Sequence, residues 1–292
     1  MRDHSRRNTE SALARNCSLA FRLVVLVLLA LPVPHSSAQQ EPTNAADTAL
    51  KAAICPIVYP SDETPRNKGY RYTFFGNAFF INAQGYLVTA AHVLETFRDV
   101  GQPYILVDRS MAPPQLLKAN IIAIDWTHDV AILRAAPNPF EGKYRVAFLP
   151  LAGKRVQPGD AVVASALHPA NIRNASTYQM PVQDWSSAQV LGFVQTHEEP
   201  QLPETDLFTF SHEVQKGQSG SPVLSAASRE VTGVVDGRWL RPTSIAPSKK
   251  GTPPYSGPIG AAVPVDYLIQ LLQKNSISWT TVPAANLPPP SL

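Results

Sequence analysis

The sequence has little cysteine, little charge and no apolar run long enough to cross a membrane, and each shortage excludes a class of protein. Its 292 residues include two cysteines, Cys17 and Cys55, and Cys17 lies in an N-terminal leader that we expect to be removed. The mature chain would then hold no intrachain disulfide, so its stability depends on a hydrophobic core. We expect Cys55 to be a small buried apolar residue, because free cysteine usually packs in this way.

The leader, residues 1–38, has the pattern of a signal peptide. Five arginines precede an apolar run at 23–31, two prolines end that run, and Ser36, Ser37 and Ala38 supply the small residues that a signal peptidase requires. The run is too short to span a bilayer, which takes ~20 residues of helix. An N-terminal membrane anchor is the alternative. We predict an exported protein, periplasmic or secreted, with no stable membrane span after removal of the leader.

The charge that remains after removal of the leader is balanced. The leader holds five of the 25 basic and two of the 22 acidic residues, so 20 of each sign remain and the net charge of +3 comes from the leader. No basic field is left that would indicate binding to nucleic acid or to an anionic membrane. About 250 residues remain, which is enough for one large all-β domain with a sizeable core.

Short apolar runs separated by turn residues follow a flexible segment that we place at 39–54. This pattern is typical of an all-β barrel or sandwich. The expected strands lie at 78–81, 86–89, 104–107, 121–124, 130–133, 161–165, 188–194, 207–211, 221–224, 231–235 and 260–265. We predict a short helix at 90–97, a turn at 157–160 and a longer amphipathic helix at 265–274. The Pro-rich and Ser-rich segment 241–258 predicts a long loop.

Three segments carry the residue types of nucleophilic catalysis. They contain His92, Asp129 and Ser219, in that order along the chain. A serine hydroxyl is a poor nucleophile until an imidazole takes its proton, and the imidazole needs a carboxylate that fixes its tautomer and stabilises its charged form. Gly217 and Gly220 allow a tight turn around Ser219, in which the N–H groups of Gly217 and Ser219 would form an oxyanion hole.

These segments, together with residues 76–81, 85–89 and 260–265, resemble the trypsin-like (chymotrypsin-fold) serine proteases, and in particular their bacterial Deg or high-temperature-requirement branch. The resemblance covers roughly residues 70–275. It implies an all-β fold of two six-stranded antiparallel barrels with a C-terminal helix. The protease domain would span 55–282, with a first barrel at about 55–155 and a second at about 156–282.

The resemblance also assigns roles within the site. It makes His92 the general base, Asp129 the residue that orients it, and Ser219 the nucleophile. We expect no counterpart of the Deg branch's peptide-binding C-terminal domain after residue 275, and we interpret 283–292 as a Pro-rich tail.

Several polar residues compete with this assignment. Asp125 is the rival of Asp129, but Asp129 directly precedes an apolar strand and can point inward, whereas Asp125 would stay solvated. We expect His128 at the surface, Ser221 in a structural role, and Asn77 in a structural turn.

The substrate pocket is read from the resemblance alone. Glu213 lies six residues before Ser219, where trypsin-like proteases carry the acidic residue that selects Lys or Arg, and Val235 and Gly237 would lie on the later cleft strand. The alternative is that Glu213 faces solvent. Asp236 stands where the family usually has a small residue: facing inward, it would raise the proton affinity of Asp129 by repulsion. We expect it to face outward.

We therefore predict an exported serine endopeptidase that forms an acyl-enzyme on protein or peptide substrates and needs no cofactor and no metal. The histidines at 168, 197 and 212 lack metal-ligand spacing, and no His-Glu-x-x-His run occurs. The alternatives are a non-catalytic protease-like module that binds extended peptides, and a serine esterase. In the esterase fold the histidine comes last in the chain, whereas His92 comes first. The oligomeric state is left open.

Overall fold

A computed structural model describes residues 45–60, 72–109, 112–168, 178–196, 203–237 and 259–281. The predicted signal peptide, the 241–258 loop and the tail from 283 lie outside the described residues. All described residues belong to one compact unit, Thr43–Leu292.

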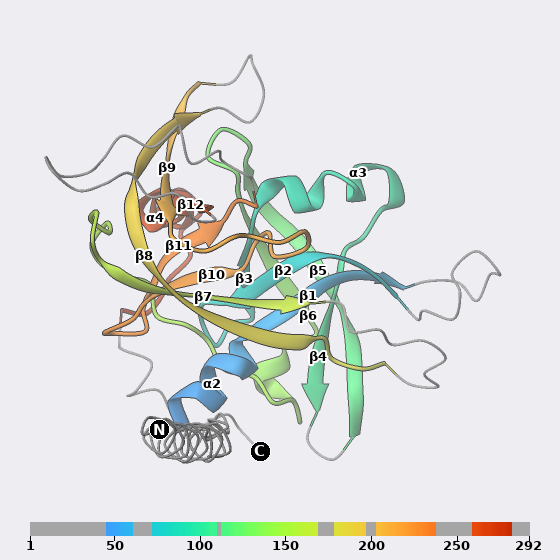
Figure 1. Cartoon of the computed structure of the whole chain (residues 1–292). Coiled ribbons are helices and arrows are strands. Elements are labelled where there is room, and N and C mark those ends of the chain that lie inside the picture. Colours follow the sequence, from blue (N-terminus) through green and yellow to red (C-terminus); the bar gives the residue numbers. More distant parts are fainter. Residues whose placement is uncertain are drawn as a thin grey trace, which may run out of the picture. The chain divides into compact units, whose positions relative to one another are not determined.

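The first half of this unit forms a closed antiparallel barrel (Figure 1). Its strands are β1 (Ile54–Pro60), β2 (Tyr72–Phe80), β3 (Tyr86–Thr89), β4 (Tyr104–Arg109), β5 (Ala112–Asp125) and β6 (Val130–Ala136). Their order around the barrel is β1-β2-β3-β6-β5-β4. Strand β1 was not predicted from the sequence. Five of its seven side chains are buried, so apolar and polar residues alternate less clearly along it than along a half-buried strand.

The second half forms a second closed antiparallel barrel. Its strands are β7 (Ala161–His168), β8 (Val182–Thr196), β9 (Thr205–Phe210), β10 (Pro222–Ser225), β11 (Val231–Val235) and β12 (Gly260–Pro264), in the order β10-β11-β12-β9-β8-β7. The predicted turn before β7 is present, since Asp160 N donates to Gln157 O over 3.0 Å. The prediction of two six-stranded chymotrypsin-like barrels is confirmed.

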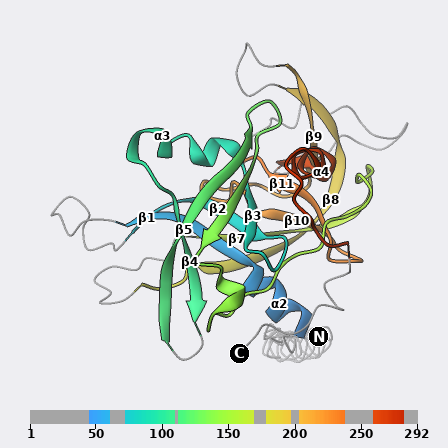
Figure 2. The same cartoon turned by 180° about the vertical axis from the view of Figure 1, so that it is seen from behind.

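The helices are short and lie at the ends of strands. The predicted C-terminal helix is α4 (Val265–Lys274), which lies near β11 in Figure 2. It contacts β6 of the first barrel as well as β11 and β12 of the second. A short 3-10 helix, η3 (Pro139–Glu141), follows β6. None of the described helices has the length and apolar character to span a bilayer.

The helix predicted at 90–97 is instead two separate turns, η2 (Ala91–Leu94) and α3 (Phe97–Val100). The first turn closes through i to i+3 hydrogen bonds, from Val93 N to Ala90 O and from Glu95 N to His92 O. Such bonds tighten the helix and rarely continue beyond one turn.

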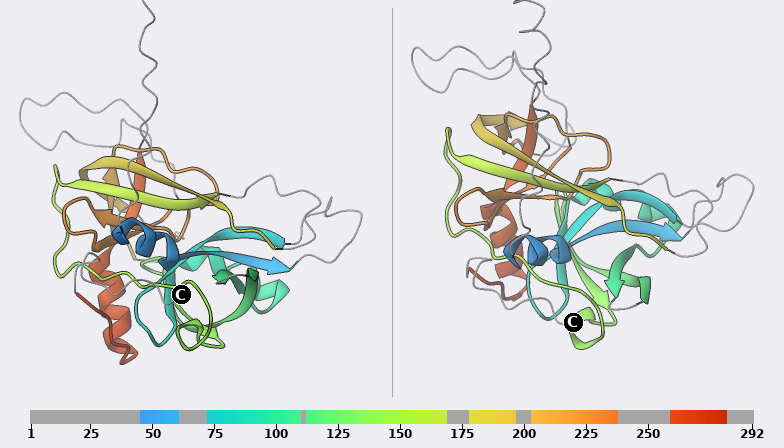
Figure 3. Two further views of the ribbon diagram at one scale, coloured as in Figure 1. Left: turned by 90° about the horizontal axis from the view of Figure 1, so that it is seen from below. Right: turned by 60° about the horizontal axis from the view of Figure 1, so that its bottom comes forward.

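The N-terminal segment differs from the flexible one that we predicted. Helix α2 (Ala45–Ala53) precedes β1 (Figure 3). Leu50 and Ala53 are fully buried in the core. Alanine, leucine and lysine favour a helix, and the apolar side of this helix finds a surface to cover. The folded domain therefore includes residues from Ala45 onward.

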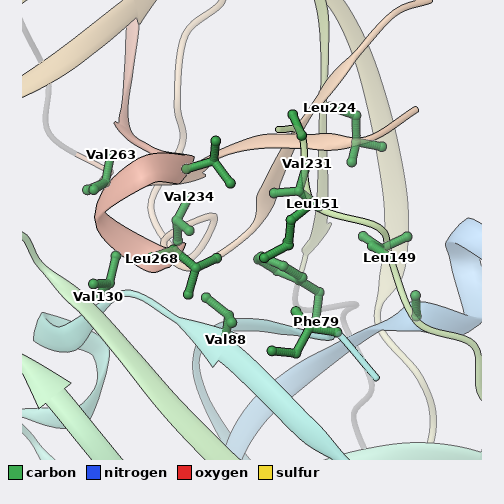
Figure 4. Packing of buried hydrophobic residues seen from close by; sticks show 14 of the residues in the cluster. Phe79, Val88, Val130, Leu149, Leu151, Leu224, Val231, Val234, Val263 and Leu268 are labelled. Carbon is green, nitrogen blue, oxygen red and sulfur yellow. The ribbon is translucent and has the colours of Figure 1, made fainter. Parts of the chain in front are cut away.

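One apolar cluster continues from the first barrel into the second (Figure 4). It combines side chains from both barrels, from the connection between them and from α4: Phe79, Val88, Val130, Leu149, Leu151, Leu224, Val231, Val234, Val263 and Leu268. The two barrels thus share a core, and this shared core fixes their relative position.

The docking of α2 onto this core can be tested by Leu50→Ala. Removal of a fully buried leucine side chain costs about 2–5 kcal/mol of unfolding free energy, since apolar contacts are lost and a cavity remains. Urea unfolding of the mature chain measures this loss. Lys51→Ala, at an exposed position of the same helix, is the matched control and should change stability by less than about 0.5 kcal/mol. Equal stabilities of the two variants would contradict the docking.

Candidate active site

His92 and Asp129 face each other at the end of the first barrel. His92 lies in η2, just after β3, and Asp129 lies in the turn that leads into β6. The His92 Nδ1 atom is 2.7 Å from Asp129 Oδ2, and the His92 backbone N–H donates to Asp129 Oδ1 over 2.8 Å. The Asp129 carboxylate is buried, whereas a third of the His92 side chain is exposed. The buried Asp129 therefore orients the His92 ring, and the exposed part of the ring is accessible to a substrate.

The turn that carries Asp129 explains why this aspartate points inward. Asp129 adopts a left-handed backbone conformation (φ 51°), which aspartate tolerates better than most residues. Its carbonyl oxygen accepts the N–H of Ala91, which ties the turn to η2. Asp125 instead pairs with His128, with Oδ2 2.6 Å from Nδ1, and the His128 ring stacks on Tyr267 at 3.9 Å. The structure thus brings Asp129, and not Asp125, to His92.

Ser219 lies on the second barrel, in the loop between β9 and β10 that we call the nucleophile loop (residues 211–221). Two glycines, Gly220 and Gly237, lie beside Ser219, and neither position has room for a side chain. A Cβ atom at Gly220 would lie 2.2 Å from Asn77 O, and one at Gly237 would lie 2.3 Å from Ser219 Oγ. No side chain fits at such distances, so these glycines allow the loop to approach β2 and keep the Ser219 hydroxyl free of steric cover.

The backbone N–H groups of Gly217 and Ser219 donate no hydrogen bond within the part of the chain that the structure describes. The carbonyl groups of the same residues are both held, since Gly217 O accepts from Asn77 Nδ2 and Ser219 O from Asn77 N, each over 2.8 Å. The two N–H groups are thus available to a developing oxyanion. Among the described residues, no hydrogen bond joins Ser219 Oγ to His92, a feature common in catalytic sites without substrate.

Asn77 is a polar link between the two barrels whose part in the site the sequence analysis missed. We expected a residue in a turn, but Asn77 lies inside β2 and is fully buried. Besides the nucleophile loop, its side chain binds the backbone of Leu167 in β7, with Leu167 N donating to Asn77 Oδ1 over 3.0 Å. A polar residue within an otherwise apolar strand was the available signal.

Gln218 anchors the nucleophile loop from inside the second barrel. Its Oε1 atom accepts the N–H of Gln215 over 2.7 Å, and its Nε2 atom lies 3.1 Å from His168 Nε2. His168 in turn lies 2.9 Å from Asp184 Oδ2. The Gln218 side chain therefore holds the residue before Ser219 through these polar contacts.

Two of the three predicted pocket residues lie near Ser219, and Glu213 does not occupy the predicted buried position. Val235 lines a small pocket together with Val214, Gln218 and Ser221. Gly237 lies against Ser219. The Glu213 side chain is exposed and is not part of the lining of this pocket. The loop before Ser219 turns it toward solvent, so the structure does not give Glu213 the burial that selection of Lys or Arg requires.

The expectation that Asp236 faces outward is wrong. Asp236 is 1% exposed and faces Asp129. Side chains alternate along an extended strand, so Val235 points into the pocket and the next residue points the opposite way. Burial raises the pKa of Asp236 well above its usual value, and the neighbouring charge of Asp129 and a hydrogen bond with it act in the same direction.

His92, Asp129 and Asp236 are also the described residues that could together hold a metal ion. One potential ligand atom from each lies within 4.8 Å of those of the other two. Within this group, His92 Nδ1 is already at hydrogen-bond distance from Asp129 Oδ2.

Two six-stranded barrels, with this site in the seam between them, are the fold of the chymotrypsin-type peptidases. A family model described as a trypsin-like peptidase domain matches residues 76–234, which is more than half of the sequence. The chain therefore belongs to the family of trypsin-like peptidases. No curated protein matches it.

Solved structures agree with this assignment at the level of the fold. The MamO protease domain from Magnetospirillum magneticum matches with a TM-score of 0.51 and 14% identity, over 76% of this chain and 96% of that one. The active form of the Rv3671c protease from M. tuberculosis gives 0.53 and 18%, over 84% and 92%. The HtrA-type protease AlgW with a tripeptide gives 0.52 and 16%, over 79% of this chain and 62% of AlgW. The resemblance to the trypsin-like proteases is confirmed, and the fold is shared with HtrA-type and Deg proteases of known structure.

The role of Asn77 can be tested by Asn77→Ala. The change leaves the buried N–H of Leu167 without this partner, at about 1–3 kcal/mol, and removes the bond to the partly buried carbonyl of Gly217, so we expect a clear fall in the unfolding free energy. Chemical denaturation measures it. The exposed Asn120→Ala on β5 serves as control and should be near neutral. A loss below about 0.5 kcal/mol in Asn77→Ala would show that these bonds do not hold the barrels together.

Proposed function

We propose that this chain is a serine endopeptidase with Ser219 as nucleophile, His92 as general base and Asp129 as the residue that orients His92. The observation that carries the proposal is the double contact of Asp129 with His92, at 2.8 and 2.7 Å, at the end of the barrel that meets the nucleophile loop. Such a pair holds the Nδ1 proton toward the carboxylate and leaves Nε2 to accept a proton.

The reaction follows from these positions. His92 Nε2 takes the Ser219 proton as Oγ attacks the carbonyl carbon of the scissile peptide bond. The negative charge on the carbonyl oxygen is stabilised by the N–H groups of Gly217 and Ser219. Protonated His92 then gives its proton to the leaving amine, which leaves an acyl-enzyme on Ser219. Water, deprotonated by His92, attacks the acyl group and releases the acid product and the serine.

Protein or peptide substrates are the class that the comparisons favour. The HtrA-type protease AlgW has been solved with a tripeptide and with a decapeptide. No cofactor is needed for the reaction above. We further propose that residues 1–38 direct export, so that the enzyme acts in the periplasm or outside the cell, as the basic leader and its apolar run suggest.

The first test is Ser219→Ala. Nucleophile and base act as one unit, so the loss of either should lower kcat by on the order of 10⁵ to 10⁶ with the fold retained. Cleavage of casein and labelling by a fluorophosphonate probe measure this loss, and circular dichroism checks the fold. Ser228→Ala, in the turn between β10 and β11, is the matched control. Casein cleavage by Ser219→Ala at near the wild-type rate would refute the mechanism, and a preference for short-chain esters over casein would favour the esterase.

The second test concerns activation. In trypsin-like zymogens, a freed terminal ammonium pairs with an aspartate just before the nucleophile, but here that residue is Gln218, which Gln215 and His168 hold. We therefore expect a chain that starts at about residue 39 to be active, and to stay active when its N-terminus is acetylated. Active-site titration of the two forms compares them. An inert long form that becomes active only on trimming near Cys55 would overturn the expectation.

A further inference from the structure

Two carboxyl groups are buried together behind His92. Asp129 and Asp236 are each 1% exposed, and they face each other at the point where the turn before β6 meets the end of β11. Two adjacent carboxylates in a buried site cannot both be ionised at small cost, because burial weakens the screening of their repulsion. One proton shared by the pair removes this repulsion.

The contacts of Asp129 decide which group keeps the charge. Both of its oxygens are close to nitrogen atoms of His92, at 2.8 Å to the backbone N–H and 2.7 Å to Nδ1. These donors stabilise the ionised form of Asp129. The proton therefore belongs on Asp236, and the strongly raised pKa of Asp236 agrees with this assignment.

We propose that Asp236 is a positioning residue that is held as a neutral carboxylic acid and donates its proton in a hydrogen bond to Asp129. The pair then carries a single negative charge, which matches the single positive charge that His92 acquires during catalysis. The titratable groups that face Asp236 are Asp129 and His92, as far as the described residues show.

Backbone contacts of Asp236 and its neighbours connect the Asp129–Asp236 pair to Ser219. Asp236 N donates to Ala261 O over 3.1 Å, so its place beside β12 is fixed. The preceding residue, Val235, accepts the N–H of Gly220 and donates to Ser221 O, each over 2.8 Å. The following residue, Gly237, packs against Ser219 Oγ. A displacement of the Asp236 side chain would therefore change the positions of both His92 and Ser219.

The positioning role rests on the proposed function, whereas the location of the proton does not, and the test treats the two separately. The variants are Asp236→Asn, which keeps a donor and loses the titration, and Asp236→Leu, which loses both. Asp99→Asn, an exposed carboxylate on α3, is the matched control.

The first measurement is the pH dependence of kcat and KM for peptide cleavage. Asp236→Asn should keep the neutral-pH kcat within about threefold, whereas Asp236→Leu should lose about 10- to 100-fold in kcat, the range for a hydrogen bond to a charged group. Wild type should lose activity at alkaline pH as Asp236 ionises, and Asp236→Asn should lack this step. Identical profile shapes in wild type and Asp236→Asn, or inhibition of wild type by EDTA, would overturn the positioning role.

The second measurement needs no activity. The infrared spectrum of the wild-type protein at neutral pH should contain the band of a protonated carboxyl, which is absent from Asp236→Asn and present in Asp99→Asn. A proton held only in the folded state stabilises it fully below the ordinary pKa of 3.8 and progressively less above it. The Tm of wild type should therefore fall relative to that of Asp236→Asn as the pH rises above about 4.

These two measurements separate the possible failures. Without the carboxyl band, and with a Tm difference that is constant with pH, the shared proton is refuted whatever the activity. With the band present but no fluorophosphonate labelling of Ser219, the proton is where we place it and the proposed function fails.

Discussion

The contact between β2 and the nucleophile loop is the constraint on which the rest of the site depends. His92 and Asp129 belong to the first barrel and Ser219 to the second, so their alignment requires the two barrels to meet in one fixed register. The bond from Asn77 N to Ser219 O, at 2.8 Å, sets that register, and the absence of a side chain at Gly220 makes the approach possible. The Asn77 amide extends the same contact to Gly217 and Leu167.

The apolar cluster beneath this contact keeps it in place. Side chains of both barrels and of α4 pack together, and most of them are fully buried. A packed core of this kind resists small displacements, so a local polar contact at the seam can hold its geometry. The titratable side chains of the site depend on this packed core for their positions. The carboxylate of Asp129 is stabilised by His92, and Asp236 lies behind it as a second acid.

The parts of the structure that the sequence predicted are those whose signal is local. Alternating apolar runs indicated the strands of both barrels, and the position of Asp129 directly before such a run indicated that it, and not Asp125, points inward. Helix α2 was missed because it is stabilised by packing of Leu50 against the core, which the local sequence does not reveal. Asp236 was expected to face outward, and the path of Glu213 was left open, for a related reason. The direction of a side chain depends on strand register and loop path, and both are set by contacts far apart in the chain.

The most direct measurement of the central claim is a crystal structure of the protein after reaction with a peptidyl phosphonate. The account predicts continuous electron density from Ser219 Oγ to phosphorus, with one phosphoryl oxygen at hydrogen-bond distance from the N–H groups of Gly217 and Ser219 and with His92 still paired to Asp129. A phosphonate bound to another residue, or a peptide bound along the cleft with Ser219 unmodified, would contradict it.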